Sequence, residues 1–191
     1  MTPFEYILPL VSVLVGLAIA DLAVSFNRLL RARHRVSWDW LTLLSAFIAL
    51  LAVLDIWWMF SGEQDATFYY TLAGFLPFAV QLILLFLINA AALPDDVPEE
   101  GISLKEFYAA NSVYLWGLFT VYFLSIFVSR AITHLIADGD VWNMLTHTVW
   151  NVVMLAFFGS LILIKRRWYH GVVLIVFLIV YFSGWSLRTL G

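Results

Sequence analysis

The sequence predicts an all-α integral membrane protein, a bundle of six transmembrane helices. Of its 191 residues, 63% are hydrophobic and 12% are charged, whereas a soluble domain has about 45–50% and about 25%. The chain also contains six apolar stretches of the length that crosses a bilayer as a helix, about 20 residues. These stretches span about 4–28, 40–60, 68–93, 107–129, 141–164 and 168–187.

The composition excludes several other classes of protein. The mean hydropathy is +0.94, and the few polar residues cannot cover so much apolar surface in water. The chain has no cysteine and a net charge of −3, which excludes a disulfide scaffold and a nucleic-acid partner. The apolar runs are continuous rather than alternating, so they predict helices rather than strands.

The first stretch is expected to stay in the protein rather than act as a cleaved signal. Its leader, MTPFEY, contains no lysine or arginine, and the apolar run is too long for a secretory signal. All connections are short, so the sequence predicts one polytopic membrane domain over residues 1–191. The longest connection, 93–105, divides it into two halves of three helices.

The two halves show faint similarity. Ser12-Val13 recurs as Ser112-Val113, and the aromatic cluster that begins at Phe68 aligns with one that begins at Trp168. Since each half has three spans, the second half would be inverted relative to the first. Inverted repeats are typical of transporters, in which the binding site lies near the midplane.

The orientation follows from the basic residues. Eight of the ten lysines and arginines lie in the loops after the first, third and fifth stretches. Cytoplasmic loops carry this excess, so we expect an inner (plasma) membrane location with both termini outside, in the periplasm. The loop charges also attract anionic lipid headgroups, at about 1 kcal/mol per charge. The residues expected to set the topology are Arg28, Arg31, Arg33, Arg35, Lys165, Arg166 and Arg167.

Polar residues within the apolar stretches are the candidate functional residues. An aspartate at the centre of a membrane helix costs about 2.5–3.5 kcal/mol, so Asp21 and Asp55 are expected to face the bundle or water. Small residues at Ser12, Gly16 and Ala20 predict close packing of the first helix on that face. Trp116 and Trp150 lie deep in their stretches and are expected to pack between helices.

Further polar side chains extend through the predicted bilayer. Asp140, Asn143, His147 and Asn151 share one helix face, and another stretch carries Gln81 and Asn89. Two interpretations are open: the groups form a ladder that conducts protons or small cations, or they join helices by hydrogen bonds. The predicted polar path consists of Asp21, Asp55, Gln81, Asn89, His147 and Asn151.

The sequence contains no catalytic motif and no cluster with metal-ligand spacing, so we expect neither an enzyme nor a cofactor or metal. The leading hypothesis is a transporter or channel-like protein that moves protons, cations or a small solute. The alternative is a non-catalytic structural or assembly subunit of a larger membrane complex. A pigment-, quinone- or haem-associated subunit is a weaker third option. The expected partners are membrane lipids and other copies or subunits within the bilayer.

Overall fold

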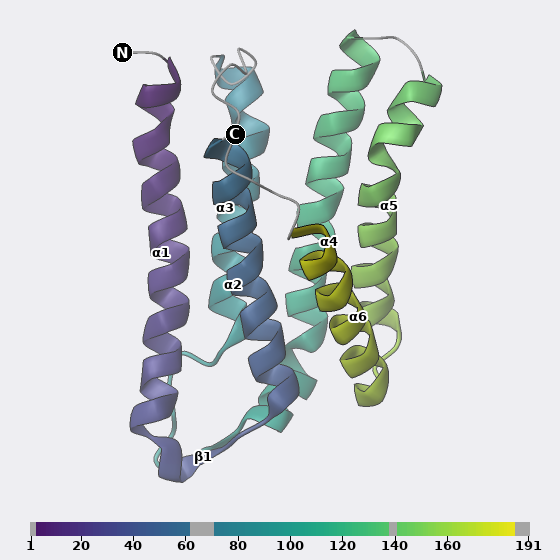
Figure 1. Cartoon of the computed structure of the whole chain (residues 1–191). Helices are drawn as coiled ribbons and strands as arrows, with labels where there is room; N and C mark the ends of the chain where they lie inside the picture. The colour runs from purple at the N-terminus through teal and green to yellow at the C-terminus, as the bar shows by residue number, and fades with distance from the viewer. Residues whose placement is uncertain (1–2, 62–70, 138–140, 186–191) are drawn as a thin grey trace.

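The computed structural model describes residues 3–61, 71–137 and 141–185, and this part of the chain is helical apart from its loops and two strands of two residues each. It contains six α-helices, and successive helices run in opposite directions along the molecule (Figure 1). They are α1 (Pro3–Arg31), α2 (Trp40–Ser61), α3 (Leu72–Ala92), α4 (Leu104–Ala137), α5 (Val141–Leu163) and α6 (Arg167–Trp185). The predicted all-α class is confirmed, and each apolar stretch forms a helix. Residues 68–70 of the third stretch lie outside the described residues.

Within the described residues, four helices are long and apolar enough to cross a membrane. Their apolar parts are Ile7–Arg31, Trp40–Phe60, Leu72–Ala92 and Leu104–Thr133. The apolar parts described in α5 and α6 are shorter, Thr148–Leu163 and Arg167–Ser183. The structure is therefore compatible with a membrane location and supports four spans by length and composition.

Two inter-helix loops meet at one end of the bundle. A 3₁₀ turn, η1 (Arg33–Arg35), leads into β1 (Val36–Ser37), which pairs in parallel with β2 (Ile102–Ser103). Gly101 precedes β2 with φ +94°, and a Cβ there would lie 2.5 Å from the Arg35 carbonyl oxygen. Glycine is the residue that adopts this backbone conformation without strain. We call this end, which carries the arginine-rich loops, the basic end (Figure 1).

The inward face of α1 differs from the predicted one. Val11, Val15, Ala18, Leu22 and Leu29 are buried at the spacing of one helix face, and α1 packs on α2 and α3. The small-residue face turns away from them, because Gly16 and Ala20 are exposed and a Cβ on Gly16 would meet nothing within 4 Å. The prediction of close packing on this face is therefore wrong for the isolated chain.

Aromatic rings fill the contact between α4 and α5. Trp116 stacks on Phe119 at 5.3 Å between ring centroids, and Phe119 stacks on Phe158 at 4.9 Å. Trp116 is fully buried, as predicted. Trp150 is 53% exposed, so the same prediction is wrong for Trp150, because its position on α5 faces away from this contact.

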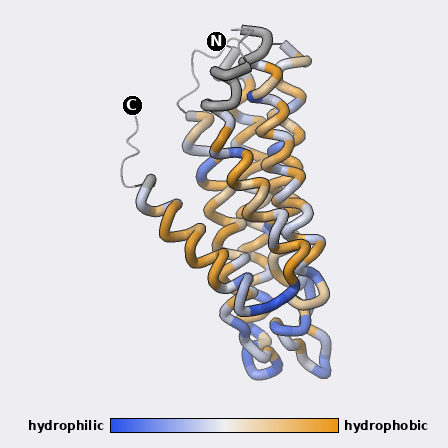
Figure 2. The backbone as a smooth tube through the Cα atoms, turned by 90° about the vertical axis from the view of Figure 1, so that its right-hand side faces the viewer, coloured by the Kyte–Doolittle hydropathy of each residue, from blue (hydrophilic) through white to orange (hydrophobic). Residues whose placement is uncertain are grey.

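Helix α6 leaves the bundle along its length. Near its start Gly171, Val173 and Leu174 are buried, whereas none of the described residues from 175 onward is buried. Figure 2 shows the helix, largely hydrophobic, leaning away from the other five as it rises from the basic end. This lean opens a space between α6 and the body of the bundle.

Candidate functional site

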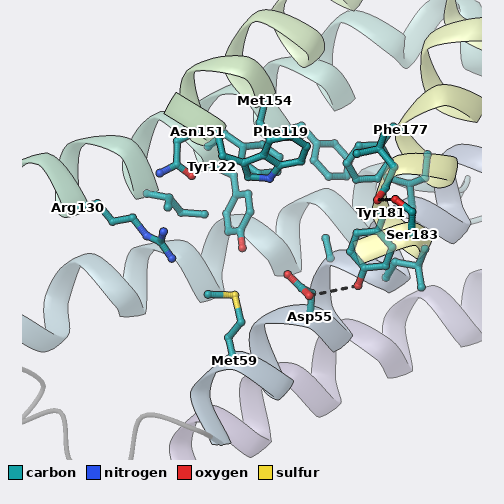
Figure 3. A pocket seen from close by; sticks show the side chains of 17 residues that line it. Asp55, Met59, Phe119, Tyr122, Arg130, Asn151, Met154, Phe177, Tyr181 and Ser183 are labelled. Carbon is teal, nitrogen blue, oxygen red and sulfur yellow. Dashed lines mark hydrogen bonds between the residues drawn. The ribbon is translucent and has the colours of Figure 1, made fainter. Parts of the chain in front are cut away.

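A cavity of about 550 Å³ lies where α6 leans away from α2, α4 and α5. Most of its wall is apolar, including Ile48, Leu51, Phe119, Phe123, Met154 and Phe177. Its polar lining consists of Asp55, Tyr122, Arg130, Asn151, Tyr181 and Ser183 (Figure 3). Small-molecule sites in proteins have this character and size, with apolar walls and a few convergent polar groups.

Asp55 reaches the cavity from α2. It lies fifteen residues after Trp40, where α2 begins, which places it about 20 Å from the basic end at 1.5 Å per residue. Its carboxylate Oδ1 accepts a hydrogen bond from the Tyr181 hydroxyl at 3.3 Å. This bond joins α2 to the part of α6 that has left the bundle (Figure 3).

Two side chains of α4 share the cavity with Asp55. Tyr122 is buried, whereas Arg130, two turns further along the helix, is exposed. In Figure 3 the Tyr122 hydroxyl lies between the Arg130 guanidinium and the Asp55 carboxylate. The cavity therefore contains an acidic group and a basic group with a hydroxyl between them.

Asn151 supplies the polar group of α5. It is 6% exposed, and its amide nitrogen is buried with no hydrogen-bond partner. A buried donor without an acceptor costs about 1–3 kcal/mol. Such an exception to the pairing of buried polar groups requires an explanation, and a group bound in the cavity is one.

The remaining members of the predicted polar path do not line this cavity. Gln81 and Asn89 are buried in α3, and the Asn89 amide donates to the carbonyl oxygens of Leu85 at 2.8 Å and Ala49 at 3.3 Å. Asp21 lies in α1 with Oδ2 buried and unpartnered. The side chain of His147 lies outside the described residues. The structure thus brings Asp55 and Asn151 together and leaves Asp21, Gln81 and Asn89 elsewhere in the bundle.

The basic end of α6 is fixed by an ion pair. Arg167 Nη2 lies 2.6 Å from Asp39 Oδ1. The second oxygen, Asp39 Oδ2, accepts from the Thr42 backbone nitrogen at 3.2 Å and its hydroxyl at 3.1 Å. Asp39 therefore caps the start of α2 as a helix N-cap residue does while it holds α6.

A buried chain of hydrogen bonds lies next to this ion pair. Trp116 Nε1 donates to the Tyr108 hydroxyl at 3.0 Å, and that hydroxyl lies 2.6 Å from His170 Nδ1. His170 Nε2 lies 2.8 Å from the Ile164 carbonyl oxygen, which can only accept. The proton of a neutral His170 is therefore on Nε2, and Tyr108 donates to Nδ1. This chain joins α4 to α6 on the basic side of the aromatic stack.

The predicted topogenic residues gather at the basic end, where the loop after α1 also contacts the loop after α3. Arg28 pairs with Asp96 at 3.4 Å and also donates to the Asp95 carbonyl oxygen. Arg35 donates to the Glu99 carbonyl oxygen at 3.5 Å. The acidic 93–101 segment therefore lies against the first arginine loop. The exposed members of the predicted set are Arg28, Arg31, Arg33, Arg35, Lys165 and Arg166, whereas Arg167 is partly buried.

Sequence reasoning did not assign Arg130 and Tyr181 to the site. Arg130 is one of two basic residues outside the three basic loops, and this departure was the available signal. Tyr181 gave no signal, because a tyrosine near a helix end is typical of the membrane interface. Within residues 3–61, 71–137 and 141–185, no group of three or more His, Asp or Glu side chains could hold a metal ion. Comparison with protein-family models, curated proteins and solved structures found no match to this chain.

Proposed function

We propose that this chain is a non-enzymatic, six-span membrane transporter whose binding site is the cavity between α6 and the bundle. The proposed location is the inner membrane, with the basic end in the cytoplasm and both termini outside. The observation that carries the proposal is the 550 Å³ cavity with Asp55 turned into it. A carboxylate in an apolar wall attracts a cationic group strongly, because the surroundings screen it weakly.

The cavity favours a solute over a continuous proton or ion path. A path would require polar groups along the whole bundle, whereas Asp21, Gln81 and Asn89 do not line the cavity. On its basic side the cavity meets the stack of Trp116, Phe119 and Phe158. A site with a closed side near the midplane suits transport by alternating access, in which α6 and the bundle would move relative to each other.

Uptake into proteoliposomes tests the proposal. The probe is radiolabelled phenethylamine, which combines an ammonium group with an aromatic body. Wild-type protein is expected to take up the probe in a saturable way. Asp55→Asn, which keeps the side-chain shape, should reduce uptake at least about tenfold. Lys105→Gln, at an exposed position of the basic end, should retain it. Uptake that is equal in empty liposomes, or unchanged in Asp55→Asn, would contradict the proposal.

An assembly subunit is the second candidate, and the exposed face of α1 favours it. In the small-residue stripe Ser12, Gly16 and Ala20, the last two residues are exposed, and a Cβ on Gly16 would meet no atom of the described residues within 4 Å; such stripes let a neighbouring helix approach closely. This candidate predicts that the chain purifies as a homo-oligomer or with another membrane subunit. Gly16→Leu should dissociate that assembly while the chain alone stays folded.

A further inference from the structure

We infer that the cavity recognises a zwitterion on an apolar body, with an ammonium group at the Asp55 end and a phosphate or carboxylate at the Arg130 and Asn151 end. The inference rests on the proposed function, because it names the substrate class of the same cavity. Figure 3 shows the two ends: Asp55 and Tyr181 lie toward one side of the view, and Arg130 and Asn151 toward the other.

The Asp55 end suits an ammonium group. The Tyr181 hydroxyl, 3.3 Å from Asp55 Oδ1, fixes the carboxylate at the edge of the cavity. Aromatic rings of Tyr122, Phe177 and Tyr181 line the same cavity, and the face of an aromatic ring attracts a cation. A carboxylate beside aromatic rings therefore provides both a charge partner and a weakly hydrated surface for an alkylammonium.

The Arg130 end suits an oxyanion. Arginine stays charged at every physiological pH, and its planar fork donates two parallel hydrogen bonds to a carboxylate or phosphate. The Asn151 amide nitrogen, from the neighbouring helix α5, is buried without an acceptor. An oxyanion at this end would give the Arg130 guanidinium a partner, and a rotation of the Asn151 side chain toward the cavity would give its amide one too.

The volume of the cavity and its apolar lining favour a ligand that has an apolar body as well as the two charged groups. A cavity of about 550 Å³ is far larger than one small ion needs, and most of its lining is apolar. A ligand with one charge would interact with only one of Asp55 and Arg130, whereas a ligand with both charges gains a charge-assisted interaction at each end. A zwitterionic amphiphile has a charged group for Asp55, one for Arg130, and an apolar body for the apolar lining of the cavity.

Equilibrium binding to detergent-purified protein tests the inference with a matched set of ligands. Phenylalanine carries both charges, phenethylamine only the ammonium and 3-phenylpropionate only the carboxylate, on nearly the same body. A second pair, lysophosphatidylethanolamine and lysophosphatidylglycerol, is zwitterionic and anionic on an acyl chain. In at least one set the zwitterion should bind about tenfold more tightly than its single-charge relatives, the gain expected from one added charge-assisted hydrogen bond.

Two variants separate the two ends. Arg130→Gln should abolish the advantage of phenylalanine over phenethylamine and leave the binding of phenethylamine unchanged. Asp55→Asn should abolish the advantage of phenylalanine over 3-phenylpropionate and leave that anion's binding unchanged. For the lipid pair, Asp55→Asn should equalise the two affinities. A misfolded protein cannot give this selective pattern. Lys105→Gln and Glu100→Gln, at exposed positions of the basic end, are the matched controls.

The set in which the preference appears identifies the source of the zwitterion, either a free solute or a lipid headgroup. Equal binding of zwitterionic and single-charge ligands in both sets, or no binding in either, would overturn the inference. So would a preference that persists in Arg130→Gln and Asp55→Asn. Binding is measured without flux, so a chain that binds zwitterions but does not transport refutes only the proposed function. Uptake of phenethylamine without a zwitterion preference refutes only this inference.

Discussion

The two ends of α6 differ in how they are held. At the basic end, Arg167 pairs with Asp39, and His170 bonds to both Tyr108 and the Ile164 carbonyl. Toward its other end the helix leans away from the bundle, where the Tyr181 hydroxyl donates to Asp55 at 3.3 Å and the Phe177 ring contacts Phe158 at 5.4 Å between centroids. The comparison shows a helix held at one end by an ion pair and a buried chain of hydrogen bonds, which together form its anchor, and bordered at the other by the cavity. Residues of the anchor should therefore govern stability, and residues of the cavity should govern binding.

Asp39→Ala should give the largest loss of stability, about 3 kcal/mol in the free energy of unfolding. The change leaves the partly buried Arg167 without its ion-pair partner and removes the cap at the start of α2. Unfolding in mixed micelles by titration with a denaturing detergent, followed by tryptophan fluorescence, measures it. Glu100→Ala, at an exposed loop position, should change stability by less than about 0.5 kcal/mol. Equal stabilities of the two variants would contradict the anchor.

Tyr108→Phe should have an intermediate effect, a loss of about 1–2 kcal/mol. The substitution keeps the ring but removes the hydroxyl that joins Trp116 Nε1 to His170 Nδ1. Trp116 Nε1 and His170 Nδ1 then lose this hydrogen-bond partner in a buried place, and unsatisfied buried groups are destabilising. The same unfolding titration measures the effect. Tyr114→Phe, at a position that is 54% exposed, is the matched control and should be neutral. A Tyr108→Phe variant as stable as this control would show that the chain of bonds contributes nothing.

Asp55→Asn should change stability least, by less than about 0.5 kcal/mol, because the position is partly exposed and the asparagine oxygen can still accept from the Tyr181 hydroxyl. Its effect on phenethylamine uptake should nevertheless be the greatest of the three variants. Parallel measurement of unfolding and uptake separates the two ends of α6. A destabilisation as large as that of Asp39→Ala would mean that Asp55 belongs to the anchor, and the comparison would fail.

The helices could be predicted from the sequence because their signal is local. A continuous apolar run of about 20 residues has few alternatives to a helix in a membrane protein. The inward face of each helix could not be predicted in the same way, because the residues that face lipid are as apolar as those that face other helices. In α1, the small residues suggested one face, whereas Val11, Val15 and Leu22 are the ones buried.

In the candidate site, too, some features could be predicted from the sequence and others depend on how the helices pack. Asp55 and Asn151 stood out in the sequence because polar groups are rare and costly in apolar helices. Which of the polar residues meet depends on the lean of α6 and on packing among four helices, and neither has a sequence signal of its own. Asp21 is as unusual in sequence as Asp55, yet it lies in α1 and away from the cavity. The two inverted halves stay a prediction.

The central claim is that Asp55 is reachable through a cavity that is closed toward the basic end. The chain has no cysteine, so single cysteines at chosen positions can be labelled with a membrane-impermeant maleimide in intact cells. The account predicts rapid labelling of Asp55→Cys, slow labelling of Asn89→Cys in the buried part of α3, and labelling of Lys105→Cys only after permeabilisation. Protection of Asp55→Cys in intact cells, together with labelling of Lys105→Cys there, would contradict it.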